Sequence, residues 1–231
     1  IHKTKGALHT LASNQILSLY RDDANRIWIG TQLGLNLYDP YLDQFTYLVS
    51  EKNNERSLAA NETFSIFEDS KGGLWIGNYA NGLTVIHDLE GEKHFRHIAA
   101  GNGLKQLSGA QVLDFEEDDL GRIWVATFNG INIIDWPDRN TDQFTIRRFP
   151  LTSVPNNPHL SQYTYMVTKG PNGTMWIGTH GAGAIMISPD GQMKQYCFQD
   201  KPQGITENIV LNIAFDDKER VWLAHNPLGI S

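Results

Sequence analysis

The chain has little cysteine, no concentrated positive charge and no long apolar run. Its 231 residues include one cysteine, Cys197, so no disulfide can form within the chain. The net charge is −7 and no basic block occurs, which argues against nucleic acid as a partner. No stretch approaches the ~18 apolar residues of a membrane-spanning helix, so we expect no membrane contact by this segment.

No segment of ten or more residues shows the apolar periodicity of an amphipathic helix. Instead, one phrase recurs: an apolar residue, a tryptophan, an aliphatic residue and a small residue. Its five copies lie at intervals of 46 to 52 residues and centre on Trp28, Trp75, Trp124, Trp176 and Trp222. A period of this size is typical of solenoids, propellers and arrays, in which each repeat is one supersecondary unit.

Each copy contains the pattern of four short strands. Apolar residues alternate with a mostly polar one before the tryptophan, as in Leu17-Ser18-Leu19, which predicts a strand with one apolar face. A turn rich in Asp, Asn and Gly precedes the tryptophan strand, which is apolar at successive positions and therefore covered on both faces. Further strands are predicted after it, for example at residues 35–38 and 45–48. Four antiparallel strands per repeat predict an all-β fold, the β-propeller.

We therefore predict one β-propeller segment over residues 1–231. Its blades are expected at about residues 12–50, 59–99, 108–150, 160–199 and 206–231, the last one incomplete. Propellers protect their sheet edges by closing the ring, so an incomplete blade favours a segment of a larger propeller. The alternative is a five-bladed ring in which residues 1–11 complete the fifth sheet. The end sheets are expected to be covered by neighbouring blades or by a second copy.

The recurring phrase resembles the two-component regulator propeller repeat, which joins an apolar strand, an aspartate, a turn, Trp-Ile-Gly-Thr and Gly-Leu. Residues 16–37 and 64–85 fit it most closely, and residues 110–133 differ by Ala126 in place of glycine. The fourth copy departs from it at Gly170-Pro171. The fifth departs after its tryptophan, at residues 223–225.

This resemblance implies a context that the residues themselves do not show. Such repeats form the periplasmic sensor region of hybrid two-component system histidine kinases of Bacteroidetes, as paired seven-bladed propellers in proteins anchored in the inner membrane. We therefore expect a non-enzymatic, carbohydrate-sensing segment of a longer phosphorelay protein, with an oligosaccharide as ligand. The alternatives are a propeller enzyme, either a lyase or a glycosidase, and a protein-interaction propeller without a small-molecule ligand.

The loops that follow the tryptophan strands depart most from the repeat and open on one face. Aromatic, Asn and His side chains there suit a sugar, because rings cover C–H faces while amides and imidazoles bond hydroxyls. The candidate ligand-binding residues are Tyr79, Asn81, Phe128, Asn129, His180, His225 and Asn226. Arg56, Lys105 and Tyr163, in the long loops between blades, are secondary candidates. For any one of these residues, a solvated loop position is the simpler interpretation.

No catalytic residue, metal site or cofactor is predicted. The aspartates that recur six residues before a tryptophan are interpreted as structural, since a glycosidase needs two unequal carboxylates that flank one bond. They are Asp22, Asp69, Asp118 and Asp216. Asp114 is a lone acid on a first strand, and we interpret it as a hydrogen-bonded residue that lines the channel. The repeat tryptophans are expected in the core, whereas Trp136, outside the repeat, is expected to be exposed.

Overall fold

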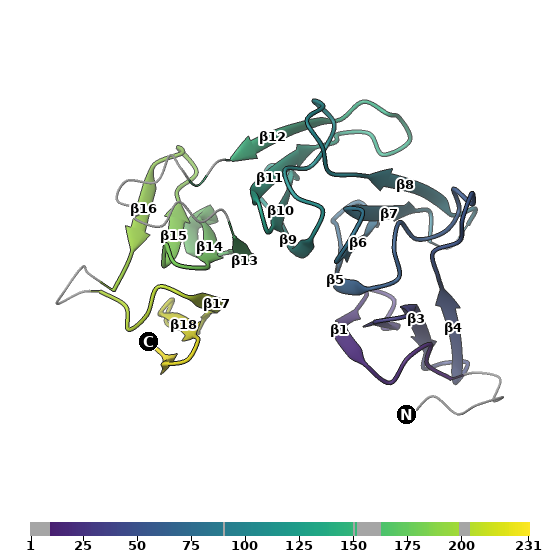
Figure 1. Cartoon of the computed structure of the whole chain (residues 1–231), viewed down its shortest axis with the longest axis horizontal. Coiled ribbons are helices and arrows are strands. Elements are labelled where there is room, and N and C mark those ends of the chain that lie inside the picture. Colours follow the sequence, from purple (N-terminus) through teal and green to yellow (C-terminus); the bar gives the residue numbers. More distant parts are fainter. Residues whose placement is uncertain (1–9, 90, 150, 152–162, 199–203) are drawn as a thin grey trace. The chain divides into compact units, whose positions relative to one another are not determined.

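The computed structural model describes residues 10–89, 91–149, 151, 163–198 and 204–231. In these ranges the chain forms five antiparallel sheets, four of them with four strands and one with three. Each sheet keeps its strands in chain order, as Figure 1 shows. The all-β prediction with four-stranded repeats is confirmed. The described residues form two compact units, one of residues up to Val112 with Asp138–Asp142, the other of Leu113–Pro137 with Gln143–Ser231.

The first unit contains two complete sheets. Their strands are β1 (Ile16–Arg21), β2 (Ile27–Thr31), β3 (Gly34–Asp39), β4 (Gln44–Leu48), β5 (Thr63–Glu68), β6 (Leu74–Asn78), β7 (Leu83–His87) and β8 (His94–Ile98). Trp28 and Leu35 of one sheet pack against Ile66 and Ile76 of the next in a common apolar core. The two sheets therefore bury each other, as consecutive propeller blades do.

The second unit contains the other three sheets, and its first strand begins at the unit boundary. Its strands are β9 (Val112–Glu117), β10 (Ile123–Thr127), β11 (Gly130–Asp135), β12 (Thr145–Phe149), β13 (Thr164–Lys169), β14 (Met175–Thr179), β15 (Ala184–Ile187), β16 (Met193–Tyr196), β17 (Val210–Phe215), β18 (Val221–His225) and β19 (Gly229–Ile230). A single 3-10 turn, Pro171–Gly173, joins β13 to β14. Trp124 packs against Ile177 of the following sheet, and Trp176 against Leu223 of the sheet after that.

A tryptophan marks the same place in the register of each four-stranded sheet. It pairs with an apolar residue of the third strand, which in turn pairs with a residue of the outer strand. These rows are Trp28–Leu37–Thr46, Trp75–Val85–Arg96, Trp124–Ile133–Arg147 and Trp176–Met186–Lys194. Directly paired residues of an antiparallel sheet point to the same face, so each of these "tryptophan rows" lies on one face of its sheet.

The first strand is less regular than its sequence pattern predicts. In β5, Thr63 pairs with Asn78 and Ser65 pairs with Gly77, so Phe64 is the extra residue of a β-bulge. The same register shift occurs in β1, β13 and β17. The regular alternation predicted for these strands is therefore interrupted, because a bulge adds a residue and re-aims its side chain.

The prediction that the repeat tryptophans form the core holds for four of the five. Trp28, Trp75, Trp124 and Trp176 are buried, whereas Trp222 is 45% exposed. Its sheet is the last one in the part of the chain that the structure describes, so no further sheet covers its ring there. The prediction for Trp136 is wrong: this residue is buried, and its ring centroid lies 5.0 Å from that of Phe144. Burial against a second ring removes a large apolar surface from water, which favours this arrangement.

Candidate functional site

The recurrent aspartates hold the tryptophan strands, as predicted from their positions. Asp22 Oδ2 accepts a hydrogen bond from the Trp28 indole nitrogen at 2.8 Å and another from Arg26 Nε at 2.7 Å. Asp118 repeats this pattern with Trp124 at 2.8 Å and Arg122 at 2.7 Å. Burial alone would raise the pKa of Asp118, but the bonds from Arg122 and Trp124 outweigh it and lower the pKa. These carboxylates are engaged in the scaffold.

The second sheet achieves the same arrangement with an arginine from elsewhere in the sequence. Gly73 occupies the position at which the first and third copies have an arginine, two residues before the tryptophan. Asp69 instead receives Arg139, whose guanidinium nitrogen lies 2.8 Å from Asp69 Oδ2 and whose Cζ lies 5.4 Å from the Trp75 ring centroid. This pairing was not predicted, because the two partners lie 70 residues apart.

Four aromatic side chains meet at one end of the second unit. We name Phe128, Tyr163, Tyr165 and His180 the rim cluster. The Phe128 and Tyr163 rings meet edge to face with centroids 4.9 Å apart, and Tyr163 meets the His180 ring at 5.8 Å. The Tyr165 hydroxyl and His180 Nδ1 share a hydrogen bond of 2.7 Å. Burial and then the neighbouring Tyr163 raise the pKa of Tyr165.

The backbone explains how these side chains come together. Phe128 lies in the tight turn between β10 and β11, where Thr127 Oγ1 donates to the carbonyl of Gly130 at 2.8 Å. Gly130 there has φ +91°, a conformation that favours glycine. The backbone N–H of His180 donates to the carbonyl of Tyr163 at 3.0 Å, which joins the loop after β14 to the start of β13.

Three members of the rim cluster were predicted as candidate or secondary candidate residues, and the fourth was missed. Phe128 and His180 were selected from the loops after the tryptophan strands, and Tyr163 from a loop between blades. Tyr165 stands eleven residues before Trp176, as Leu17 stands before Trp28, so the alternating pattern predicts only a strand residue there. It is the bulge residue of β13, between Thr164 and Met166, and this irregularity turns it toward His180. The sequence of a single copy gives no sign of the bulge. The available signal is that a large apolar or aromatic residue recurs at this position when the copies are compared.

The first unit has a smaller aromatic pair at the equivalent place. Tyr79, 40% exposed, lies with its ring centroid 5.2 Å from that of Phe64, the bulge residue of β5. Asn81 adopts φ +66° and its amide donates to the carbonyl of Ala59 at 3.2 Å, so this residue shapes its own loop. Asn129 similarly donates its backbone N–H to Thr127 Oγ1 at 3.1 Å.

The remaining candidates make contacts away from the rim cluster. His225 is buried, and its Nε2 lies 2.6 Å from the Ser231 hydroxyl within the last sheet. Asn226 donates its backbone N–H to the carbonyl of Ile209 at 3.4 Å. Among the secondary candidates, Arg56 forms an exposed ion pair with Glu92 at 2.7 Å, and Lys105 donates to the backbone carbonyl of Asp142.

Asp114 lies in the interface between the third and fourth sheets. Its Oδ2 accepts the backbone N–H of Val167 on β13 at 3.0 Å, which agrees with a hydrogen-bonded role. Burial raises the pKa of this carboxyl to about 7, and the bonds from Val167 and Phe115 offset part of that effect. A protonated Asp114 therefore coexists with the ionised form near neutral pH.

The described ranges contain neither a candidate metal site nor a helix that could span a membrane. No group of three or more His, Cys, Asp and Glu side chains there has the arrangement of a metal site. In the same ranges, no helix reaches the length and apolar character required to cross a membrane.

The sequence also matches a known repeat family. Residues 10–32 and 57–80 match the two component regulator propeller family. These two segments carry two-component regulator propeller repeats. The resemblance predicted from the tryptophan phrases is thus confirmed. The chain is also similar to part of histidine kinase P4 of Formosa agariphila, with 30% identity over 105 residues. That match covers 44% of this chain and 7% of the kinase, so the chain spans a small part of its relative.

Solved structures of low sequence identity share the fold of these repeats. One is the extracellular domain of a hybrid two-component system from B. thetaiotaomicron, at 19% identity and a TM-score of 0.56, with 99% of this chain and 34% of that chain covered. Another is virginiamycin B lyase from Staphylococcus aureus, at 15% identity and a TM-score of 0.63, with 94% and 69% covered. At such identities the likeness shows a propeller fold alone.

Proposed function

We propose that this propeller segment belongs to the extracytoplasmic, periplasmic sensor region of a hybrid two-component signalling protein and that it binds an oligosaccharide at the rim cluster. The repeat family, the histidine kinase relative and the two-component extracellular domain of similar fold support the sensor role. The parent protein is a histidine kinase anchored in the inner membrane. Ligand binding shifts the packing of the repeats by its differential affinity for two states, and the kinase reads this change.

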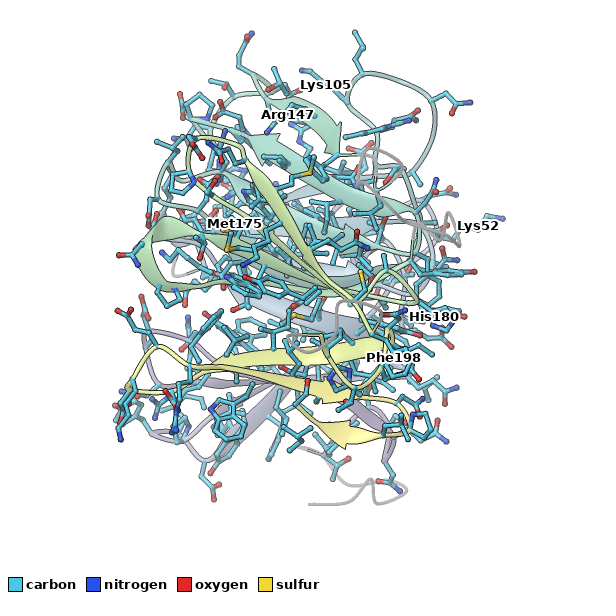
Figure 2. All side chains as sticks on the ribbon, turned by 90° about the vertical axis from the view of Figure 1, so that its left-hand side faces the viewer. Lys52, Lys105, Arg147, Met175, His180 and Phe198 are labelled. Carbon is cyan, nitrogen blue, oxygen red and sulfur yellow. The ribbon has the colours of Figure 1, made fainter. Side chains whose placement is uncertain are left out.

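The composition of the rim cluster is the observation that supports an oligosaccharide as the ligand. Tyr163 is 46% exposed and His180 is also exposed, so both reach solvent while they contact each other. An aromatic face covers the apolar C–H side of a sugar ring, and the adjacent imidazole and phenol bond its hydroxyls. Figure 2 labels His180 near the edge of the view, and the exposure of this residue allows a ligand to approach it from solvent.

The enzyme alternative receives less support from the residues. Asp22, Asp69, Asp118 and Asp216 each accept a hydrogen bond from an indole, so these carboxylates serve the scaffold. The fold shared with a lyase does not carry its activity to this chain. A protein-interaction propeller remains the second alternative, and the binding experiment below distinguishes it.

The experiment is a calorimetric screen of this chain against a panel of oligosaccharides from plant, algal and host polysaccharides. For a bound oligosaccharide, we expect Tyr163→Ala to weaken affinity about tenfold, or about 1.4 kcal/mol, through loss of one stacking face. Tyr165→Phe removes the hydroxyl that contacts His180 and should weaken binding less. The control Tyr41→Ala removes another exposed tyrosine, in the first unit, and should leave affinity unchanged.

Two results would contradict the proposal. One is a panel without any binding oligosaccharide, combined with capture of a specific protein partner, which supports the interaction propeller. The other is an oligosaccharide that binds equally well to the Tyr163→Ala chain. Turnover of a panel member would instead establish the enzyme.

A further inference from the structure

A loop of the chain lies against the second sheet, beside its tryptophan row. Residues 138–142, which connect β11 to β12, belong to the first unit rather than to the unit of their own strands. Arg139 bonds Asp69 and lies over the Trp75 ring. Asp142 of the same loop forms an ion pair with Arg96. The loop therefore brings one cation and one carboxylate to two sites on the second sheet.

The third sheet presents an equivalent cation. Arg96 ends the row that begins at Trp75, and Arg147 ends the row that begins at Trp124. Because directly paired residues share a face, both arginines lie on the same face of their sheets as the respective tryptophan. Arg147 is exposed, and within the described ranges its guanidinium makes neither a hydrogen bond nor an ion pair.

A pocket of about 410 Å³ lies beside Arg147, between the third and fourth sheets of the chain, both of which belong to the second unit. The connection between β15 and β16 is here a short turn that includes Pro189 and Gly191, so this connection does not fill the space. Trp124 and Phe149 of the third sheet and Met175 of the fourth sheet supply apolar walls. Arg147 and Met175 are labelled in Figure 2. A volume of this size is typical of small-molecule sites.

The other charged side chains around the pocket already have partners. Asp118 accepts bonds from Trp124 and Arg122, and Asp119 lies 3.2 Å from Lys169 Nζ. Asp190 accepts hydrogen bonds from Ser188 and Gln192. Three carboxylates and one arginine of the lining thus already have hydrogen-bond or ion-pair partners, whereas the guanidinium of Arg147 has none among the described residues. A guanidinium without a partner selects a carboxylate, which it can bind through two parallel N–H donors.

We propose that this pocket binds a small organic carboxylate with a single-ring body, in the place that residues 138–142 occupy at the second sheet. The carboxylate pairs with Arg147 as Asp142 pairs with Arg96. The ring packs against Phe149 and Met175. The pocket shares no residue with the rim cluster, so this site is independent of the proposed oligosaccharide site.

The test uses the whole chain, labelled with nitrogen-15, and follows by NMR the backbone amide signals of Gly173 and Gly191, which line the pocket and are present in every variant. The probes are D-glucuronate and benzoate, with D-glucose and benzyl alcohol as their uncharged counterparts. We expect saturable shifts with at least one carboxylate and none with its counterpart. Arg147→Gln should weaken binding at least tenfold, and Arg147→Lys, which keeps the charge but loses the planar fork, should weaken it less.

A matched control comes from the next residue. Arg148 pairs with Asn132, so it points to the opposite face of the sheet, and Arg148→Gln makes the same change in charge. This variant should bind the carboxylate as the unaltered chain does, and so should Tyr163→Ala. The proposal is overturned if neither carboxylate binds, if an uncharged counterpart binds equally well, or if Arg147→Gln and Arg148→Gln weaken binding equally. Thermal unfolding of each variant verifies that the fold is intact.

Discussion

Arg139 and Asp69 form a buried ion pair between a loop and a sheet that lie 70 residues apart in sequence. Their side chains are 7% and 0% exposed, and the closest nitrogen–oxygen distance is 2.8 Å. Burial by itself would raise the pKa of Asp69, but the Trp75 indole and the Arg139 guanidinium outweigh it, and the pKa lies below its ordinary value. The ionised carboxylate is therefore the form that the fold stabilises.

Removal of Arg139 should destabilise the chain. In Arg139→Ala, Asp69 keeps its bond from Trp75 but loses its only described counter-charge while it stays buried. We expect the free energy of unfolding to fall by about 2–4 kcal/mol, since a buried charge without its partner is costly. Urea unfolding at neutral pH measures this change. Arg56→Ala removes an exposed pair with Glu92 and should change stability by less than about 0.5 kcal/mol; equal effects of the two variants would contradict a buried ion pair.

The same pair should make stability depend on acid pH. The folded-state pKa of Asp69 is lowered, so its stabilising contribution is complete above the unfolded pKa of about 4 and is lost as the pH falls through the folded value. Asp69→Asn removes this titration. The difference in unfolding free energy between the unaltered chain and Asp69→Asn should therefore shrink as the pH falls below about 4. A difference that does not vary with pH would mean that the Asp69 carboxyl has an ordinary pKa.

Asp114 should have the opposite pH dependence. Its folded-state pKa is raised to about 7, above the unfolded value of 3.8, so folding favours the protonated form. Stability is greatest below the unfolded pKa and is lost as the pH rises through the folded pKa. Asp114→Asn keeps an oxygen that can accept the N–H of Val167. We expect this variant to be more stable than the unaltered chain at pH of about 8, by roughly 2 kcal/mol, and not at pH of about 4; chemical denaturation at both pH values measures the change.

The sequence predicts the strands that recur in every copy, but it does not predict the side-chain contacts between residues of different copies. The place of Trp28, Trp75, Trp124 and Trp176 in buried strands follows from a local pattern that is repeated along the chain. The contact of Arg139 with Asp69 does not follow from this pattern. Gly73 shows that the second copy lacks the local arginine, but it does not show which residue pairs with Asp69 instead. Trp136 was misjudged for the same reason, since its partner Phe144 lies across a loop whose path the repeat does not specify.

The candidate site was predictable at the level of loops but not of side-chain contacts. The departure of Phe128 and His180 from the repeat marked them as candidates. Their connection through Tyr163 depends on edge-to-face contacts between two sheets, and that of Tyr165 depends on a bulge in β13. Bulges follow from the fit of paired strands, so single-strand periodicity does not predict them.

Equivalent tryptophans should differ in their contribution to stability. Trp124 is 3% exposed and donates to Asp118 at 2.8 Å, whereas Trp222 is 45% exposed and donates to Asp216 at 3.1 Å. Trp124→Phe removes buried atoms and leaves Asp118 with one donor fewer, so we expect a loss of about 1–3 kcal/mol. Trp222→Phe should cost less than about 1 kcal/mol. Thermal unfolding compares the two, and similar losses would mean that Trp222 is covered in solution.

We predict that the isolated chain self-associates through exposed apolar residues of its first and last sheets. Leu19 is 66% exposed, although the residues at its position in the other copies are buried or nearly so; these are Ile66, Phe115, Val167 and Ile213. In the last sheet along the chain, Trp222 and Ile230 are 45% and 67% exposed. Exposed apolar surface of this kind associates, so we expect the chain at micromolar concentration to form dimers or larger species. Trp222→Lys with Ile230→Lys should shift it toward the monomer in light scattering after size exclusion, whereas Tyr41→Lys should not. A chain that is monomeric before any substitution would show that these faces remain solvated without a partner.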